Sequence, residues 1–207
     1  MAFPTLGTLD TFTRADENPI ANGWAGPIWT GEPQLKIVSN QALIASGTFG
    51  NSYWTTQLGP DFEAYFTLTS ALGSGERVII YFRSTVGSPN GYRIQFRNDA
   101  GDHKIVIDKD TVQIGAVIDP ADTFSSGDKF GVEVIGNTFT AYYKDGAGAW
   151  TNMGSRTDST YTIAGYCGIA ITGSAVTIDD FGGGTLGGGG GGGGGSTPGR
   201  ILTMGVG

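Results

Sequence analysis

The chain has 207 residues, enough for one generous domain, and only 15% of them are charged. The net charge of −7 at neutral pH argues against a nucleic-acid partner, because phosphate binding requires clustered Lys and Arg. No apolar stretch is long enough to span a bilayer, and the single cysteine, Cys167, excludes an internal disulfide framework.

From residue 35 onward, short apolar segments are separated by Gly, Asn, Asp and Pro. In residues 62–69 every second residue is apolar, which is the period of a strand with one buried face. Residues 78–82 are apolar on both faces, so we expect this strand to be central in its sheet. The expected strands, in chain order, are residues 35–38, 41–44, 62–69, 77–83, 92–97, 104–107, 111–114, 130–135, 138–143, 166–172 and 176–181.

Tight hairpin turns are expected at residues 39–40 and 136–137. No window shows helical periodicity over a useful length, and residues 119–124 could form one helical turn at most. Many short strands separated by turn residues predict an all-β fold, an antiparallel β-sandwich of the jelly-roll type, in residues 1–181. Cys167 lies in an apolar run and is expected to be a small buried side chain.

Residues 10–16 (DTFTRAD), followed by Trp24 and by a late Asp-Asp-Phe at residues 179–181, resemble the concanavalin A-like lectin/glucanase jelly roll, in its laminin-G-like branch. Residues 127–142 are similar to the late hairpin of that family. The resemblance implies that the first and last strands lie side by side. Domains with a similar Phe-x-Arg-Ala-Asp segment are frequent in phage structural proteins and in secreted bacterial proteins, so the fold by itself leaves the function open.

Catalytic groups are not evident. The glucanases of this superfamily carry two glutamates and an aspartate in the pattern E-x-D-x-x-E, which this sequence lacks. Asp61 and Glu63 are expected at a solvated strand edge, and His103, the only histidine, at the surface. One His and one Cys cannot form an ordinary zinc site. We therefore expect no catalytic residues, and a glycoside hydrolase or lyase is the least supported interpretation.

The same resemblance implies that a structural Ca²⁺ ion could be held by carboxylate and backbone carbonyl oxygens, the ligands this cation prefers. Asp16 and Asp179 belong to the local acidic clusters that would contribute ligands. The simpler interpretation, which we favour, places Asp16 in a turn near the N-terminus and Asp179 at a strand end. No other cofactor is expected.

Aromatic side chains are candidates for stacking against sugar rings. Four tryptophans lie in scattered segments of the chain. Trp54, Trp150 and Tyr53 are the residues expected to form an exposed carbohydrate-binding platform. Alternatively, they are core residues, because sandwiches routinely bury tryptophans.

Residues 182–207 are expected to form a glycine-rich tail, with nine consecutive glycines at residues 187–195. A glycine run alone behaves as a flexible linker. The last residues are apolar again, and Leu202, Met204 and Val206 share one face at the period of a strand. Such an end suits an assembly contact, for example a strand added to the sheet of another subunit.

Two interpretations follow, and they can coexist in one protein. The first is a non-enzymatic virion structural protein of a bacteriophage, a capsid decoration, tail or fibre subunit, which contacts copies of itself or other virion proteins through the tail. The alternative is a carbohydrate-binding module or lectin-like adhesion protein whose partners are cell-surface glycans. Residues 1–7 lack the features of a signal peptide. We therefore expect synthesis in the host cytoplasm and a location in the virion, with an extracellular location as the alternative.

Overall fold

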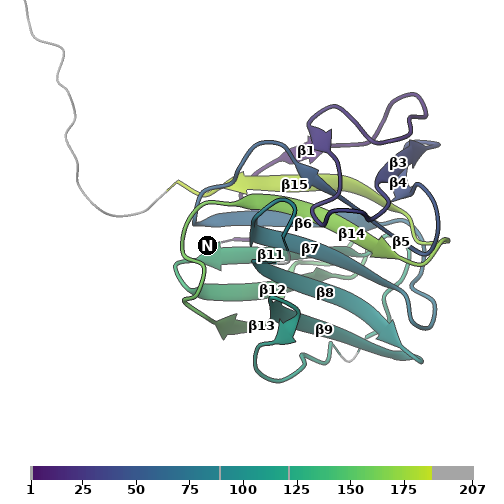
Figure 1. Cartoon of the computed structure of the whole chain (residues 1–207). Coiled ribbons are helices and arrows are strands. Elements are labelled where there is room, and N and C mark those ends of the chain that lie inside the picture. Colours follow the sequence, from purple (N-terminus) through teal and green to yellow (C-terminus); the bar gives the residue numbers. More distant parts are fainter. Residues whose placement is uncertain (1, 89, 121, 188–207) are drawn as a thin grey trace, which may run out of the picture.

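The computed structural model describes residues 2–88, 90–120 and 122–187. The chain folds into two antiparallel sheets that pack face to face, which confirms the predicted sandwich (Figure 1). The described residues contain no helix, and hence none long and apolar enough to cross a membrane. The helical turn considered for residues 119–124 is not found in the described part of that segment.

One sheet has eight strands and the other has seven. The eight-stranded sheet has the order β13 (Thr151–Thr157), β12 (Thr138–Lys144), β11 (Lys129–Ile135), β6 (Phe62–Leu68), β15 (Ile178–Thr185), β4 (Gln41–Ile44) and β3 (Leu35–Val38), and β1 (Thr8–Asp10) also pairs with β15. The seven-stranded sheet has the order β10 (Val112–Gln113), β9 (Asp102–Lys109), β8 (Tyr92–Asp99), β7 (Arg77–Ser84), β14 (Tyr166–Thr172), β5 (Phe49–Trp54) and β2 (Trp24–Ala25).

The core lies between the two sheets and is built from alternate residues of each strand. Phe82 of β7 points inward and is fully buried. From the opposite sheet, Phe66 of β6 stacks on Phe130 of β11, with 5.4 Å between the ring centroids. Cys167 is buried in the same core, as predicted. Each fully buried large apolar side chain stabilises the fold by roughly 1.5–3 kcal/mol.

The strands with clear apolar alternation form where the sequence predicts them. The hairpins at residues 35–44 and 129–144 are confirmed as β3–β4 and β11–β12. β7 lies between β8 and β14, the central position that its two apolar faces predict. The sequence did not predict β1, β2, β5 or β13. β5 reads FGNSYW and β13 reads TNMGSRT, so neither has an apolar residue at every second position.

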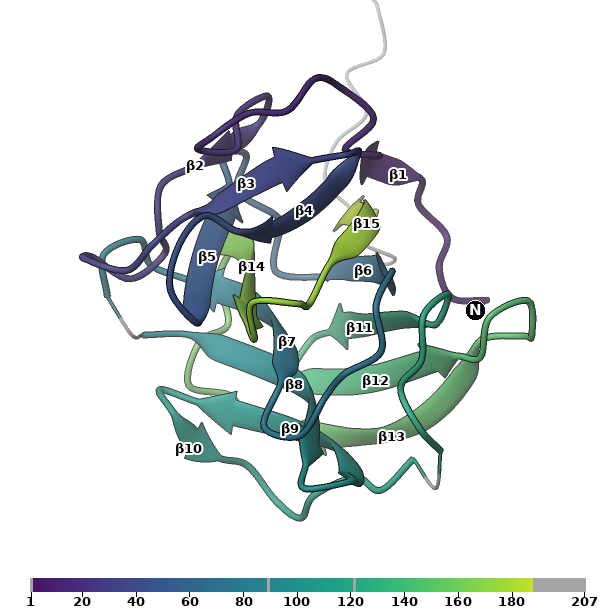
Figure 2. The ribbon, with the colours of Figure 1, turned by 90° about the vertical axis from the view of Figure 1, so that its right-hand side faces the viewer.

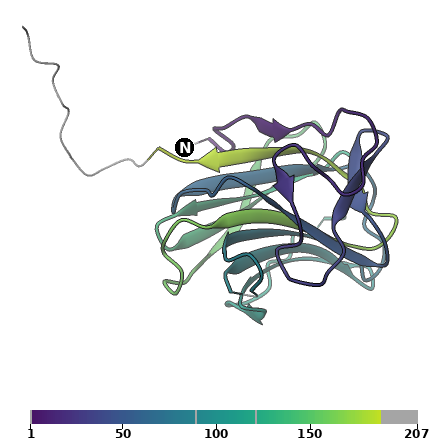
Figure 3. The same cartoon turned by 45° about the horizontal axis from the view of Figure 1, so that its top comes forward.

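The first and last strands lie side by side, as the family resemblance implies (Figure 3). Asp10 of β1 pairs with Phe181 of β15. β15 does not end at Phe181, where the sequence places the end of the domain, but continues to Thr185. Gly183 has a φ of 130°, and a Cβ at this position would overlap the carbonyl oxygen of Glu63 on β6. The first glycines after Phe181 therefore belong to the sheet.

The N-terminal residues 2–7 cover part of the outer face of the eight-stranded sheet, over β6, and the N-terminal segment begins beside β11 (Figure 2). Glu63 is fully buried beneath this segment instead of lying at a solvated edge. Its carboxylate accepts the backbone N–H groups of Thr5 at 2.7 Å and Leu6 at 2.5 Å. Both faces of β6 are thus buried where the sequence predicted one, because the chain's own N-terminal segment packs on the second face.

Aromatic packing secures the same segment. Phe3 stacks on Tyr142 with 4.1 Å between the ring centroids, and its edge contacts Trp150 at 4.9 Å. Tyr65 packs against the same group, with its ring 6.1 Å from that of Trp150. The side chain of Phe3 is 6% exposed as a result. The part of this outer face around Glu63, Tyr65 and Tyr142 is therefore covered by the protein itself.

Candidate functional site

The outer face of the seven-stranded sheet differs from that of the other sheet. Arg77, Ile79 and Tyr81 of β7 alternate with the inward-facing core residues, so their side chains lie on this outer face. Arg93 of the neighbouring strand β8 lies opposite Tyr81 and points the same way. Ile79 and Tyr81 pack with Ile28 in a small apolar cluster that is separate from the core. Apolar and cationic side chains therefore share one surface.

A loop of residues 26–34 is anchored on this face. Ile28 is fully buried and its N–H donates to the side-chain oxygen of Asn51 on β5 at 2.6 Å. The Ile28 carbonyl accepts the N–H of Gly87 at 2.8 Å. The buried side chain of Ile28, together with the hydrogen bonds of its backbone N–H and carbonyl groups, holds the loop in one place. The next residue in the chain, Trp29, is positioned by this anchor.

Trp29 is half-buried and lies against the sheet. Its ring centroid is 5.8 Å from that of Tyr81, and the guanidinium carbon of Arg93 is 5.9 Å from the centre of the indole. Beside it is a hollow of about 270 Å³, lined by Trp29, Glu32, Phe49, Arg77, Ile79, Tyr81 and Arg93. The hollow combines three aromatic side chains with the charged groups of two arginines and one glutamate.

Hydrogen bonds fix the polar groups around the hollow. Arg93 pairs with the buried carboxylate of Asp108 on β9 at 2.7 Å. The amide of Gln95 donates to the same carboxylate oxygen at 2.5 Å, and its own carbonyl oxygen accepts a hydrogen bond from Arg77 at 3.3 Å. Arg77 also donates to the hydroxyl of Thr172 on β14 at 3.2 Å. The chain from Asp108 to Arg77 orients the guanidinium groups before any ligand arrives.

Some donors on this face remain without partners. Among the described residues, three buried side-chain atoms lack a hydrogen bond: Nδ2 of Asn51, the hydroxyl of Tyr81 and Nε of Arg97. All three belong to strands of the seven-stranded sheet, and all three can donate. Tyr81 is 3% exposed, and burial raises the pKa of its phenol to about 12, so the hydroxyl keeps its proton at neutral pH. An unpaired buried donor is costly unless a ligand pairs with it.

The residues expected to form a sugar platform are not brought together. Tyr53 lies on the outer face of the seven-stranded sheet, with its ring 5.1 Å from that of Tyr166. Trp54, its neighbour in β5, points the other way and packs at the edge of the core, 5.5 Å from Trp24. Trp150 packs against Phe3 over the opposite sheet. The three side chains therefore occupy three different surroundings.

Trp29 is one of the four tryptophans that the sequence offers as sugar-stacking candidates, but Trp54 and Trp150 were preferred to it. Its arginine neighbours were missed. Trp29 lies between turn residues in a segment without strand periodicity, so nothing in the sequence links it to β7 or β8. Arg77 and Arg93 each follow the alternation of an ordinary strand, where a charged residue is expected to face solvent. Only the docking of the loop onto the sheet reveals that these side chains meet.

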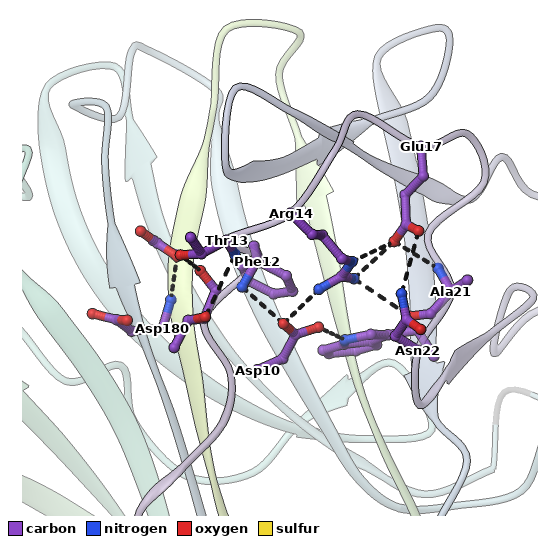
Figure 4. Close-up of polar contacts among 11 residues, drawn as sticks. Asp10, Phe12, Thr13, Arg14, Glu17, Ala21, Asn22 and Asp180 are labelled. Carbon is purple, nitrogen blue, oxygen red and sulfur yellow. Dashed lines mark hydrogen bonds and ion pairs between the residues drawn. The ribbon is translucent and has the colours of Figure 1, made fainter.

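The motif that carries the family resemblance is structural (Figure 4). The carboxylate of Asp10 accepts the N–H of Phe12 at 2.7 Å, Nη1 of Arg14 at 2.7 Å and the indole N–H of Trp24 at 2.8 Å. Arg14 also pairs with Glu17 at 2.8 Å. These contacts join β1, the following loop and β2, so the charged groups of Asp10 and Arg14 have structural partners.

The two candidate calcium ligands, Asp16 and Asp179, accept hydrogen bonds from backbone N–H groups. Asp16 accepts the N–H of Ser39 at 2.8 Å and thereby fixes the turn between β3 and β4. Asp179 accepts the N–H of the next residue at 2.8 Å, and burial raises the pKa of its carboxyl group. Within residues 2–88, 90–120 and 122–187, no cluster of three or more His, Cys, Asp or Glu side chains is arranged to hold a metal ion.

His103 is not a surface residue, contrary to the prediction. It is 9% exposed, its Nδ1 accepts the N–H of Phe124 at 2.9 Å, and burial lowers the pKa of the imidazole. A second hollow, of about 300 Å³, lies beside His103 and is lined otherwise by polar and acidic side chains, without tyrosine or tryptophan. Asp61 accepts the N–H of Gly136 at 2.8 Å. The hydrogen bonds that His103 and Asp61 accept from backbone N–H groups give both side chains structural roles.

Comparison with known proteins supports the fold. No protein-family model and no curated protein sequence matches this chain. Among solved structures, the chain is similar to the carbohydrate-binding module CBM66 from Bacillus subtilis, with a TM-score of 0.59 and 18% identity over 79% of this chain and 94% of that one. It is also similar to the exoplasmic/lumenal domain of VIP36 in its Ca²⁺/Man2-bound form, with a TM-score of 0.63 and 12% identity over 87% of each chain.

A third similar structure is an engineered GH43 glycoside hydrolase, with a TM-score of 0.53 and 16% identity. The match covers 87% of this chain but 41% of the hydrolase. At such identities the likeness establishes the shared fold and nothing about activity. This chain therefore has the jelly-roll fold that lectins and carbohydrate-binding modules share.

Proposed function

We propose that this protein is a carbohydrate-binding module that binds a saccharide in the hollow beside Trp29. The observation that carries the proposal is Trp29, held by the Ile28 anchor over a hollow whose other walls include Arg77, Arg93 and Tyr81. An aromatic ring can cover the apolar side of a sugar, and neighbouring donors can pair with its hydroxyl groups. The likeness to a carbohydrate-binding module and to a mannose-bound domain supports this choice.

Binding without catalysis is the form of this function that we favour. Glycoside cleavage uses two carboxyl groups that flank the scissile bond. Among the residues that line the hollow, Glu32 is the one with a carboxylate. The nearby carboxylate of Asp108 is buried and held by Arg93 and Gln95. One accessible carboxylate does not supply both an acid and a nucleophile.

The virion role remains a prediction. Leu202, Met204 and Val206, the residues expected to mediate assembly, lie outside the described residues. The location in a virion or outside the cell is likewise a prediction. A glycan-binding sandwich and an assembly tail would serve different steps, so the proposed site is compatible with either location.

Replacing Trp29 with Ala tests the proposal. We expect the affinity for any glycan recognised on an array to fall at least about tenfold, because stacking against the sugar ring is lost. The β-rich circular dichroism should persist, since Trp29 lies outside the main core. Trp29→Phe, which keeps an aromatic ring, should retain part of the affinity.

Trp150→Ala is the matched control, because it removes an aromatic side chain that packs over the opposite sheet. It should leave glycan binding intact in protein that is still folded. Loss of binding in Trp150→Ala but not in Trp29→Ala would move the site to the other sheet. A chain that binds no member of a broad glycan array would contradict the function itself.

A further inference from the structure

Arginines cluster on the outer face of the seven-stranded sheet. Arg77 of β7 and Arg97 of β8 are directly opposite each other in the strand pairing, and Arg93 lies on the same face of β8. Like charges in opposite positions of neighbouring strands destabilise a sheet. Arg93 is neutralised by Asp108 at 2.7 Å, and Arg97 pairs with Asp99 at 2.9 Å. Arg77, the third arginine on this face, takes part in neither of these ion pairs.

Arg77 has no carboxylate partner among the residues that the structure describes. Its hydrogen bonds go to two neutral acceptors, the carbonyl oxygen of Gln95 and the hydroxyl of Thr172. Burial, followed by repulsion from Arg93 and Arg97, lowers the pKa of its guanidinium group. A guanidinium nevertheless stays charged at neutral pH. The hollow thus holds a half-buried positive charge that no described residue neutralises.

A buried donor next to this charge needs an acceptor. The Tyr81 hydroxyl lies near Arg93 but has no partner of acceptable hydrogen-bond geometry among the described residues. It lines the same hollow as Arg77. A planar carboxylate offers two acceptor oxygens, matches the fork of a guanidinium and can also accept from a phenol. An uncharged sugar hydroxyl would leave the charge of Arg77 uncompensated.

We propose that the saccharide bound in this hollow is acidic and that its carboxylate is received by Arg77 and the Tyr81 hydroxyl while Trp29 covers its ring. This inference rests on the proposed carbohydrate-binding function and names the ligand class. The shared chemistry is a sugar with a ring-attached carboxylate, as in a uronic acid or a sialic acid. The net charge of −7 repels polyanions in general, so any such binding requires a local site.

Glu32 gives the inference a sharp internal test. Its carboxylate lines the hollow and belongs to none of the ion pairs among the described residues. For an acidic ligand, Glu32 is a repulsive neighbour, and Glu32→Gln should keep or strengthen binding. For a neutral ligand, Glu32 is a strong hydrogen-bond acceptor for a sugar hydroxyl, and the same change should weaken binding.

The experiment uses the full chain on an array that holds uronic-acid polymers, sialylated glycans and their neutral counterparts. Binding is then measured by calorimetry on matched pairs: polygalacturonate with its methyl ester, and sialyllactose with lactose. We expect the acidic member of one pair to bind at least about tenfold more tightly and to weaken as salt is raised. The pair that responds distinguishes a uronic acid from a sialic acid.

Two variants test whether the preference for acidic saccharides comes from Arg77 in the hollow. Arg77→Gln should reduce the preference for the acidic member by about tenfold or more, whereas Lys144→Gln, which removes one positive charge from the other sheet, should not. Equal binding of acidic and neutral members, or weaker acidic binding in Glu32→Gln, would overturn the inference and leave the proposed function in place. An array with no bound glycan at all would overturn the proposed function.

Discussion

His103 accepts the backbone N–H of Phe124 through Nδ1, and the imidazole and phenyl rings meet edge to face at 4.9 Å. A protonated imidazole cannot accept this hydrogen bond, because both of its nitrogens then carry hydrogen. Burial lowers the pKa of His103 below 6.5, and the nearby Asp102 opposes the shift. The neutral form is therefore the one built into the fold.

This arrangement predicts how stability depends on pH. Below about pH 6.5, His103 is protonated in the unfolded chain but still neutral in the folded chain. The free energy of unfolding should therefore fall as the pH is lowered. The decline should level off below the folded-state pKa. Urea melts between about pH 5 and 7 measure the slope, and because His103 is the only histidine, NMR titration reports its pKa directly.

His103→Gln is the companion variant, since its amide oxygen can still accept the Phe124 N–H but does not titrate. We expect this variant to lose the slope of stability between about pH 5 and 6.5 while it keeps the fold. The same slope in both proteins would show that another group is responsible.

The residues that carry the resemblance to the concanavalin A-like fold could be recognised from sequence, but their partners could not. The motif at residues 10–16 predicted the fold correctly, and the structure gives the reason: the Asp10 carboxylate joins Phe12, Arg14 and Trp24. Trp29 gave no comparable signal, because its importance depends on a loop that packs on a distant strand. A linear pattern contains periodicity and turns, whereas a site of this kind is made by tertiary contacts.

The strands that could be predicted from the sequence are those in which apolar and polar residues alternate clearly. β6, β7 and β11 bury one or both faces in the core, so their patterns are strong. β13 has no fully buried residue, and it exists because β12 offers it a pairing edge. The burial of Glu63 was missed for a related reason: a strand pattern cannot show that a segment from the N-terminus will cover its polar face.

The N-terminal segment should stabilise the sandwich measurably. Phe3→Ala removes a side chain that is 6% exposed and stacked on Tyr142, so we expect the free energy of unfolding to fall by about 3 kcal/mol. Leu9→Ala, at a side chain that is 36% exposed, is the control and should cost much less. Denaturant melts followed by tryptophan fluorescence make the comparison, because Trp150 contacts Phe3 directly. Equal losses in the two variants would mean that the segment is only loosely attached.

The last strand of the sandwich, β15, continues past Phe181 to Thr185. Gly182, Gly183, Gly184 and Thr185 pair with β6, and the Thr185 hydroxyl accepts the N–H of Gly59 at 2.8 Å. A protein truncated after residue 187 should therefore melt like the full chain. Truncation after residue 181 removes part of a paired central strand and should lower the melting temperature or prevent folding. Calorimetry of the three proteins decides where the sandwich ends, and identical melting of the two truncated forms would place the end at Phe181.

The same proteins test the predicted assembly role of the tail. If Leu202, Met204 and Val206 mediate contacts between copies, the full chain should be larger in light scattering than the form that ends at residue 187. Leu202→Asp together with Met204→Asp should match the truncated form, because a carboxylate is costly to bury in an apolar contact. Equal masses for all three proteins would assign the tail a linker role.

The anchoring of the loop at residues 26–34 has a consequence for how this protein can evolve or be engineered. The loop is fastened through Ile28 and its backbone, whereas Thr30 and Gly31 at its tip are exposed. Substitutions at the tip can therefore alter which groups surround the hollow without weakening the attachment to Asn51. Libraries randomised at exposed tip residues should yield many folded members, and new ligand preferences can be selected from them at little cost to the sandwich.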